Sequence, residues 1–181
     1  MNGPGGANGL FGRATNAGDL NGDGYADLAV ADRIGHVYVY FGSAQGISAT
    51  QQPTPLGGTT EIWSAGDVNA DGYADFISGN VVFLGSSAGV SMARSVALTN
   101  PDGAPQTAAG IGDIDGNGYS DVATGNDGIL DCLGRVYIYG GSAAGFTATQ
   151  QPIILTGPDV DDEFGISIAA RIKLPAKRRH S

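Results

Sequence analysis

The stretch "GDLNGDGYADLAV", from Gly18 to Val30, places acidic and amide side chains on alternate positions directly before an apolar run. The pattern recurs as "GDVNADGYADFIS" from Gly66 and as "GDIDGNGYSDVAT" from Gly112. The copies begin at intervals of 48 and 46 residues. A nearly constant period of this length is typical of a repeat architecture.

Each copy predicts a set of short strands. "RATNA" can form a strand before the acidic loop, and "DLAVA" after it is apolar enough to be buried on both faces. "GHVYVYFG" alternates Val and Tyr as a pleated strand does. A fourth, weaker strand is expected near "SATQQPTPL", where the prolines suit a sheet edge. Four antiparallel strands in about 47 residues predict an all-β fold of propeller blades.

The repeat predicts the organisation of the chain. We expect blades over about 11–57, 58–105 and 106–158, with the first strand of a fourth blade in 159–170. A tight hairpin at Gly79-Asn80 and a longer loop at "GNDGILDCLGR" account for different blade lengths. Residues 1–10 are expected to be flexible. The tail 171–181, "RIKLPAKRRHS", is expected to be foreign to the fold, and the alternative is a basic segment that binds an acidic partner.

Charge and composition exclude several classes of protein. The chain is 41% hydrophobic with 31 glycines, which indicates a folded, turn-rich protein. Residues 1–170 hold four basic side chains against all 18 acids, so nucleic-acid binding by the body is disfavoured. Cys132 is the sole cysteine, so no intrachain disulfide can form. No apolar run is long enough for a membrane-spanning helix.

The acidic loops offer the oxygen ligands that calcium prefers. Each loop provides three carboxylates, one amide and one backbone carbonyl, with a glycine at the sixth position, where a left-handed backbone lets the chain wrap around an ion. We therefore expect about three Ca²⁺ ions, one per loop. The expected ligands are Asp19, Asn21, Asp23, the carbonyl of Tyr25 and Asp27; Asp67, Asn69, Asp71, the carbonyl of Tyr73 and Asp75; and Asp113, Asp115, Asn117, the carbonyl of Tyr119 and Asp121.

Two other interpretations compete with a calcium hairpin. Asp, Asn and Gly also form metal-free Asx turns, but three loops of equal spacing and equal carboxylate count favour a metal. An EF-hand needs a glutamate at position 12, where this chain has Val30, Ser78 and Thr124. The loop must therefore close at its ninth position, and a strand follows it.

Together these features resemble the FG-GAP repeat, the blade of the integrin α-subunit β-propeller and of many bacterial surface and secreted proteins. The resemblance is carried by the three acidic loops, by Phe11-Gly12 and Phe164-Gly165, and by the Gly-x-Val-Tyr-x-Tyr strands at Gly35 and Gly134. The "GAP" element is degraded, and the second and third units lack the Phe-Gly pair. The resemblance implies calcium-binding hairpins on one face of a seven-bladed propeller, with partner-binding loops on the other.

The resemblance also implies a function. We expect a non-catalytic, calcium-binding module that serves as an extracellular or cell-surface scaffold for adhesion to a protein or glycan, with its export signal outside this chain. The alternative is an accessory part of a larger secreted lyase or hydrolase. His36 is expected to be an exposed strand residue, Trp63 a core residue, and Cys132 a passive loop residue. Because three and a half blades leave open edges, we expect a fragment of a larger propeller or self-association.

Overall fold

The computed structural model describes residues 11–48, 53–127, 133–159 and 161–169. Within these ranges the chain forms strands, turns and one short 3₁₀-helix, η2 (Met92–Arg94), and no α-helix. The first sheet contains β1 (Phe11–Gly18), β2 (Asp27–Asp32), β3 (His36–Tyr40) and β4 (Thr54–Gly57). The second contains β5 (Ile62–Gly66), β6 (Asp75–Ser78), β7 (Val81–Phe83) and β8 (Ser95–Ala97). The third contains β9 (Thr107–Gly112), β10 (Asp121–Asn126), β11 (Arg135–Tyr139) and β12 (Ile153–Thr156).

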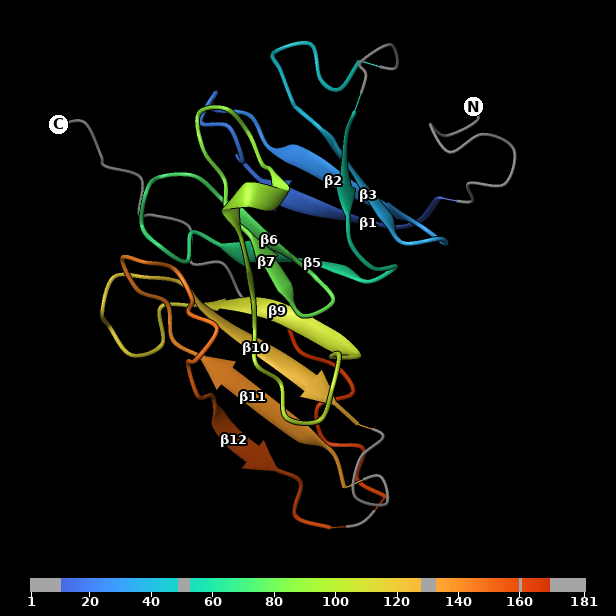
Figure 1. Ribbon diagram of the computed structural model, residues 1–181, viewed down its shortest axis with the longest axis vertical. Helices are drawn as coiled ribbons and strands as arrows, with labels where there is room; N and C mark the ends of the chain where they lie inside the picture. The colour runs from blue at the N-terminus through green and yellow to red at the C-terminus, as the bar shows by residue number, and fades with distance from the viewer. Residues whose placement is uncertain (1–10, 49–52, 128–132, 160, 170–181) are drawn as a thin grey trace, which may run out of the picture.

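Every strand pairs only with its neighbours in the chain, and every pairing within the sheets is antiparallel. Each sheet is therefore an independent four-stranded meander, as a propeller blade requires. The three sheets are stacked along the long axis of the molecule (Figure 1), and the first strand of the middle sheet, β5, contacts the first strands β1 and β9 of the other two. The described chain is thus an open array of three blades, which confirms the predicted all-β fold class.

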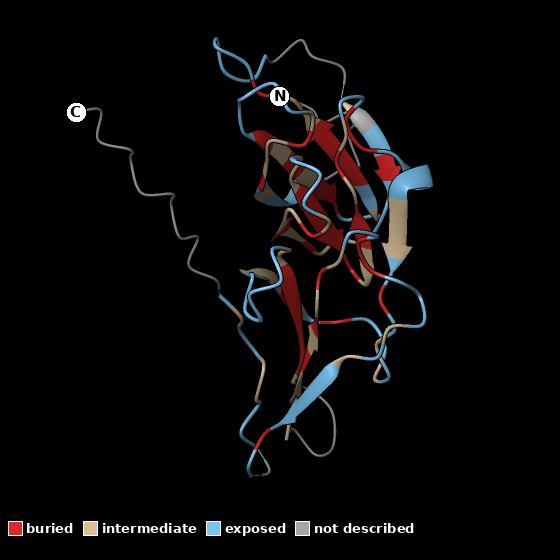
Figure 2. Cartoon of the chain, turned by 90° about the vertical axis from the view of Figure 1, so that its left-hand side faces the viewer, coloured by how far each residue is buried: buried red, intermediate tan, exposed pale blue. Residues whose placement is uncertain are grey.

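The hydrophobic core lies between the blades. One cluster joins the first and second sheets, with Leu20 and Val39 facing Phe76 and Phe83. A second cluster joins the second and third sheets. The strands β6 and β10 are buried at every residue, because sheets or chain segments cover both of their faces (Figure 2). The outer strand β12 is exposed at all four of its residues.

Several local predictions can be compared with the structure. Gly79 and Asn80 form the tight turn between β6 and β7, as predicted. The weak fourth strand is β4, which contains Pro55 and pairs only with β3. Trp63 is half-buried against the second core cluster. The loop residues 128–132, including Cys132, and the segments 1–10 and 170–181 lie outside the described residues.

The expected first strand of a fourth blade is seen only in part. Phe164 makes an isolated parallel bridge with Gly134, and its N–H donates to the carbonyl of Leu133. Residues 164–169 form no continuous strand. In each of the three blades the first strand pairs with a second strand, and no described residues provide that partner here.

Candidate metal centres

Each acidic loop connects the first strand of a blade to the second, and the three loops lie on the same side of the stack (Figure 1). One residue of the first strand is skipped in the pairing just before each loop, so each hairpin begins with a bulge. The glycine that follows the skipped residue has a positive φ, of 78° at Gly18 and 79° at Gly66. The bulge and the glycine therefore give the three loops the same backbone geometry at their first residue.

The first aspartate of each loop organises the turn through its side chain. The Asp19 carboxylate accepts hydrogen bonds from the N–H groups of Asp23 (3.1 Å) and Gly24 (2.8 Å). The carboxylates of Asp67 and Asp113 accept from the N–H groups at the same two positions of their own loops. These amide donors, led by that of Gly118, hold the pKa of Asp113 below its usual value. The Asp113 carboxylate is therefore favoured in the charged form that a cation requires.

The third and fifth positions form Asx turns. The side-chain oxygen of Asn21 accepts from the N–H of Asp23, and that of Asp23 accepts from the N–H of Tyr25. The other two loops repeat both hydrogen bonds. The turn interpretation is therefore correct for the backbone. It does not oppose metal binding, because each carboxylate oxygen has more than one acceptor site.

The ninth position anchors each loop to the end of the third strand. The buried carboxylates of Asp27, Asp75 and Asp121 each accept two backbone N–H groups, and all six hydrogen bonds measure 2.8 Å. One donor is the second residue of the same loop. The other is the glycine after the third strand, namely Gly42, Gly85 or Gly141. Three distant segments of each blade therefore meet at this aspartate.

Burial of these carboxylates has an electrostatic cost. Burial raises the pKa of Asp75 to about 7 although the N–H groups of Gly85 and Val68 oppose the rise. Burial also raises the pKa of Asp27. Nearby carboxylates of the same loops push both values further upwards. A bound cation would offset this repulsion and favour the charged form.

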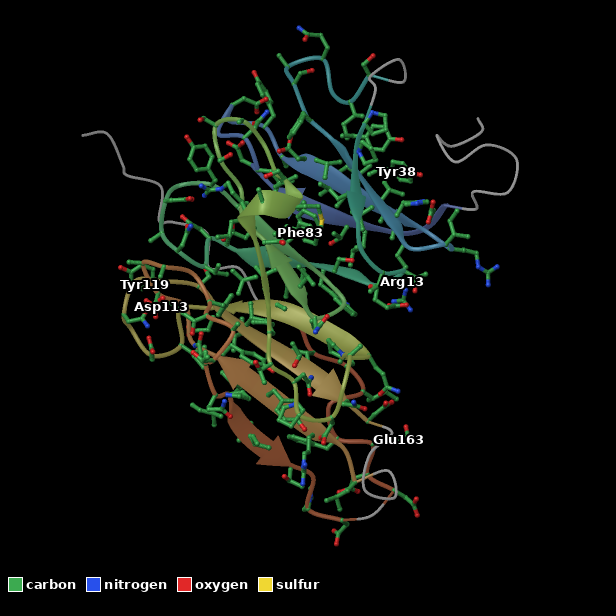
Figure 3. All side chains as sticks on the ribbon, viewed as in Figure 1. Arg13, Tyr38, Phe83, Asp113, Tyr119 and Glu163 are labelled. Atoms are coloured by element: carbon green, nitrogen blue, oxygen red, sulfur yellow. The ribbon has the colours of Figure 1, made fainter. Side chains whose placement is uncertain are left out.

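The third loop brings its predicted carboxylates closest together. One oxygen from each of Asp113, Asp115 and Asp121 lies within 4.8 Å of the others, and among the described residues this is the one group of at least three His, Cys, Asp or Glu side chains with such spacing. Asp113 and Tyr119 mark this end of the third blade in Figure 3. The first two loops carry Asn21 and Asn69 at the position of Asp115. Their third carboxylate therefore comes from the fifth position, which makes the Asx turn.

Sequence reasoning missed a basic side chain at the second loop. Arg94 donates to Asp71 (3.2 Å) and to the carbonyl of Gly85 (3.1 Å). Arg94 is the last residue of η2 and lies 23 residues after Asp71, a separation that no loop motif covers. The second loop thus already holds a positive charge beside one of its predicted ligands. The predicted carbonyl ligands at Tyr25, Tyr73 and Tyr119 stay predictions.

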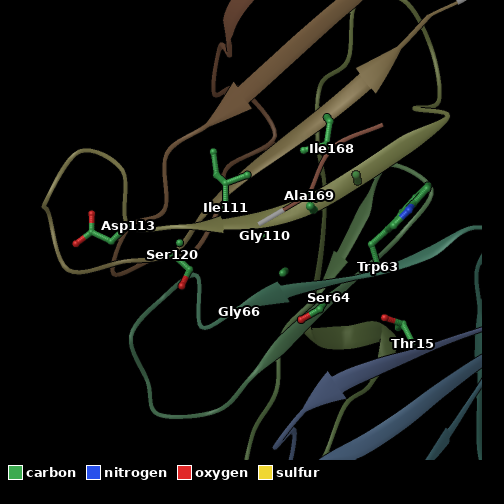
Figure 4. A pocket seen from close by; sticks show the side chains of 14 residues that line it. Thr15, Trp63, Ser64, Gly66, Gly110, Ile111, Asp113, Ser120, Ile168 and Ala169 are labelled. Carbon is green, nitrogen blue, oxygen red and sulfur yellow. The ribbon is translucent and has the colours of Figure 1, made fainter. Parts of the chain in front are cut away.

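A histidine–aspartate pair and a cavity are present besides the acidic loops. His36 lies at the exposed start of β3, and its Nδ1 is 3.0 Å from the buried carboxylate of Asp32. A cavity of about 780 Å³ lies between β5 and β9 (Figure 4), lined by apolar residues such as Trp63 and Ile111. Asp113 is the one titratable side chain among its described lining residues.

The described part of the chain holds no helix that could span a membrane.

Comparison with known proteins finds one family model that matches the first two loops. The model of the FG-GAP-like repeat matches residues 19–78, from the first aspartate of the first loop through the second loop to the end of β6. No curated protein matches the chain. The third loop lies beyond the matched range but repeats the hydrogen bonds of the first two. The chain therefore fits the FG-GAP repeat proteins, with a β-propeller-like fold.

Proposed function

We propose that this chain is a non-catalytic, calcium-binding propeller module that acts as an extracellular scaffold for adhesion to a protein or glycan. The observation that carries the calcium proposal is the convergence of Asp113, Asp115 and Asp121 within 4.8 Å. Oxygen-only ligands on a short loop suit Ca²⁺, which takes six to eight of them, better than softer metals. FG-GAP repeats often bind calcium, which supports the same assignment.

The loop structure supports a scaffolding role for the ion. The loop backbone is already ordered by its own carboxylates, so an ion would enter a pre-formed turn. Calcium would remove the repulsion among the carboxylates and link the first and ninth positions of one loop. It would thereby stiffen the hairpin that joins the first two strands of a blade.

Isothermal titration calorimetry with CaCl₂ tests the metal assignment. The unmodified chain is expected to bind about three ions, and Asp115→Asn is expected to lose or weaken one site while the other loops still bind. Asp161→Asn is the matched control, because Asp161 is exposed and lies outside every acidic loop. Absence of calcium-dependent heat from the folded chain would exclude the assignment.

The scaffold role needs a separate measurement. The chain would be applied to arrays of extracellular matrix proteins and glycans, with calcium and with chelator. Calcium-dependent capture of a defined ligand supports the role. If calcium binds but no array component is captured in either condition, the adhesion proposal fails and the metal assignment stands.

A further inference from the structure

The three acidic loops differ in the residue that follows their asparagine. Two of the asparagines precede a glycine and one precedes an alanine, in the pairs Asn21-Gly22, Asn117-Gly118 and Asn69-Ala70. An asparagine before glycine readily loses its side-chain nitrogen, because the next backbone nitrogen can attack the amide carbon and glycine has no Cβ to hinder the approach. The hydrogen bonds around the two Asn-Gly pairs show whether the folded loops favour this reaction.

The attacking nitrogen of each Asn-Gly pair lies beside a carboxylate. The N–H of Gly22 donates to the first aspartate of its loop, Asp19, at 2.7 Å. The N–H of Gly118 donates to the first aspartate of its loop, Asp113, at 2.9 Å. A carboxylate within hydrogen-bond reach of a proton can accept it as a general base. Both loops therefore hold a base against the nitrogen that would attack.

The side-chain amide under attack is held at both of its polar atoms. Asn21 Oδ1 accepts from the N–H of Asp23 at 3.1 Å, and Asn21 Nδ2 donates to the Asp23 carboxylate at 3.1 Å. Asn117 Oδ1 accepts from the N–H of Tyr119 at 2.9 Å, and Asn117 Nδ2 donates to the Asp115 carboxylate at 3.0 Å. A donor on Oδ1 stabilises the negative charge that develops there during attack. Each amide is therefore polarised for addition at its carbon.

The second loop provides an internal comparison. Asn69 makes the same two amide hydrogen bonds with Asp71, at 3.1 Å and 3.0 Å. The residue after it is Ala70, whose Cβ hinders attack by its nitrogen. Within the described part of the chain the Asp67 carboxylate accepts from the N–H groups of Asp71 and Gly72 but not from that of Ala70. The second loop thus shares the polarised amide and lacks both the glycine and the base.

We propose that Asn21 and Asn117 are sites of self-catalysed deamidation. The glycine nitrogen forms a bond with the asparagine Cγ, and its proton passes to the aspartate carboxylate. The Cγ–Nδ2 bond then breaks, and the side-chain nitrogen leaves as ammonia with that proton. Water opens the resulting succinimide ring at either of its carbonyl carbons, which leaves aspartate or isoaspartate. The reaction uses only the chain and water, so the inference does not depend on calcium binding.

The two products change a loop in different ways. The aspartate product gives the first or third loop carboxylates at its first, third, fifth and ninth positions, one more than the sequence encodes. The isoaspartate product adds a methylene group to the backbone. In the first loop this addition lies next to Gly22, where a Cβ would already be 2.6 Å from the Tyr73 ring of the next blade. Deamidation therefore adds charge to a loop or disturbs its contact with the next blade.

Peptide mass spectrometry tests the proposal after timed incubation of the folded chain in chelator at mildly alkaline pH. Trypsin places the three loop asparagines in separate peptides, since it cleaves after Arg13, Arg33, Arg94 and Arg135. Fragmentation spectra assign the change in mass to one residue. Asn21 and Asn117 are expected to convert roughly tenfold faster than Asn69 or more, as general-base catalysis predicts.

Two substitutions separate the base from the glycine. Asp19→Asn removes the base of the first loop and is expected to slow conversion of Asn21, while Asn117 in the same molecule keeps its rate as the control. Ala70→Gly completes an Asn-Gly pair in the second loop and is expected to speed conversion of Asn69. Circular dichroism confirms that each variant is folded. Equal rates at the three asparagines of the unmodified chain would overturn the proposal, as would an unchanged rate at Asn21 in Asp19→Asn or at Asn69 in Ala70→Gly.

Discussion

The backbone N–H of Ala74 donates to the carbonyl oxygen of Asp19 at 2.8 Å and thereby joins the second acidic loop to the first. The N–H of Ser120 joins the third loop to Asp67 of the second in the same way, at 3.0 Å. The residue that supplies the first predicted metal ligand of a loop therefore also holds the next blade. We therefore expect a substitution in one acidic loop to alter the contact that this loop makes with the next blade.

The pair Gly22 and Tyr73 tests this coupling. Both Gly22 and Gly24 have positive φ, so alanine at either site costs about 1–2 kcal/mol in backbone conformation. A Cβ at Gly22 would also lie 2.6 Å from the Tyr73 ring of the next blade, whereas one at Gly24 would meet nothing within 4 Å. We expect Gly22→Ala to lower the free energy of unfolding more than Gly24→Ala, as measured by urea denaturation.

The Tyr73→Ala background provides the control for that comparison. Removing the ring should remove the extra cost of Gly22→Ala and leave the two glycine substitutions equal. An unchanged difference in that background would show that the ring does not couple the loops.

The anchoring aspartate predicts a second effect on stability. Asp75→Asn replaces one acceptor oxygen with an NH₂ group that faces the N–H of either Val68 or Gly85. We expect a loss of about 1–3 kcal/mol in the free energy of unfolding, because a buried N–H group loses its acceptor. Chemical denaturation at mildly alkaline pH, compared with Asp161→Asn, measures it. Equal stability of the two variants would refute the anchoring role.

Asp32 predicts a dependence of stability on pH. Burial opposes its charge, but the N–H groups of His36 and Ile34 and the His36 ring outweigh burial and hold the pKa of Asp32 below its usual value. The unfolded chain then takes up the proton first, so this stabilisation is complete above about pH 4 and is lost as pH falls through the folded-state pKa.

Asp32→Asn should therefore lower the free energy of unfolding by about 1–3 kcal/mol at neutral pH, with a smaller difference in strong acid. Urea titrations of both proteins over this pH range provide the measurement. A difference that stays constant or grows towards low pH would contradict the assigned role of the Asp32 carboxylate.

The repeat made the architecture predictable. The alternation in "HVYVY" and the apolar run "DLAVA" identified strands that became β3 and β2, and Gly79-Asn80 identified a turn. The local structure of the acidic loops was equally predictable, because the side-chain-to-backbone hydrogen bonds that form it join residues only two to five positions apart.

Contacts between distant segments could not be predicted. The hydrogen bond from Gly42 to Asp27 spans 15 residues and that from Arg94 to Asp71 spans 23, and no local pattern specifies either. The expected strand from Phe164 was likewise inferred from local similarity to Phe11. Its pairing depends on a second strand that no described residues supply.

Arg94 provides a prediction specific to the second loop. Its guanidinium lies 3.2 Å from Asp71 and would repel a cation held there. Arg94→Gln should raise the calcium affinity of that loop up to about fivefold, the range expected for an exposed charge pair worth 0.2–1 kcal/mol. Calorimetry can resolve the change when Asp115→Asn is present to weaken the third loop. Unaltered or reduced affinity would show that Arg94 does not compete with the ion.

Calcium binding to the acidic loops is the central claim, and a thermal melt followed by circular dichroism in calcium and in excess chelator tests it most directly. At ten times the dissociation constant each site should contribute about 1.4 kcal/mol, so three sites should raise the melting midpoint by several degrees. The rise should be reversed by chelator and reduced in Asp113→Asn and Asp115→Asn. An identical midpoint with calcium and with chelator would contradict the account.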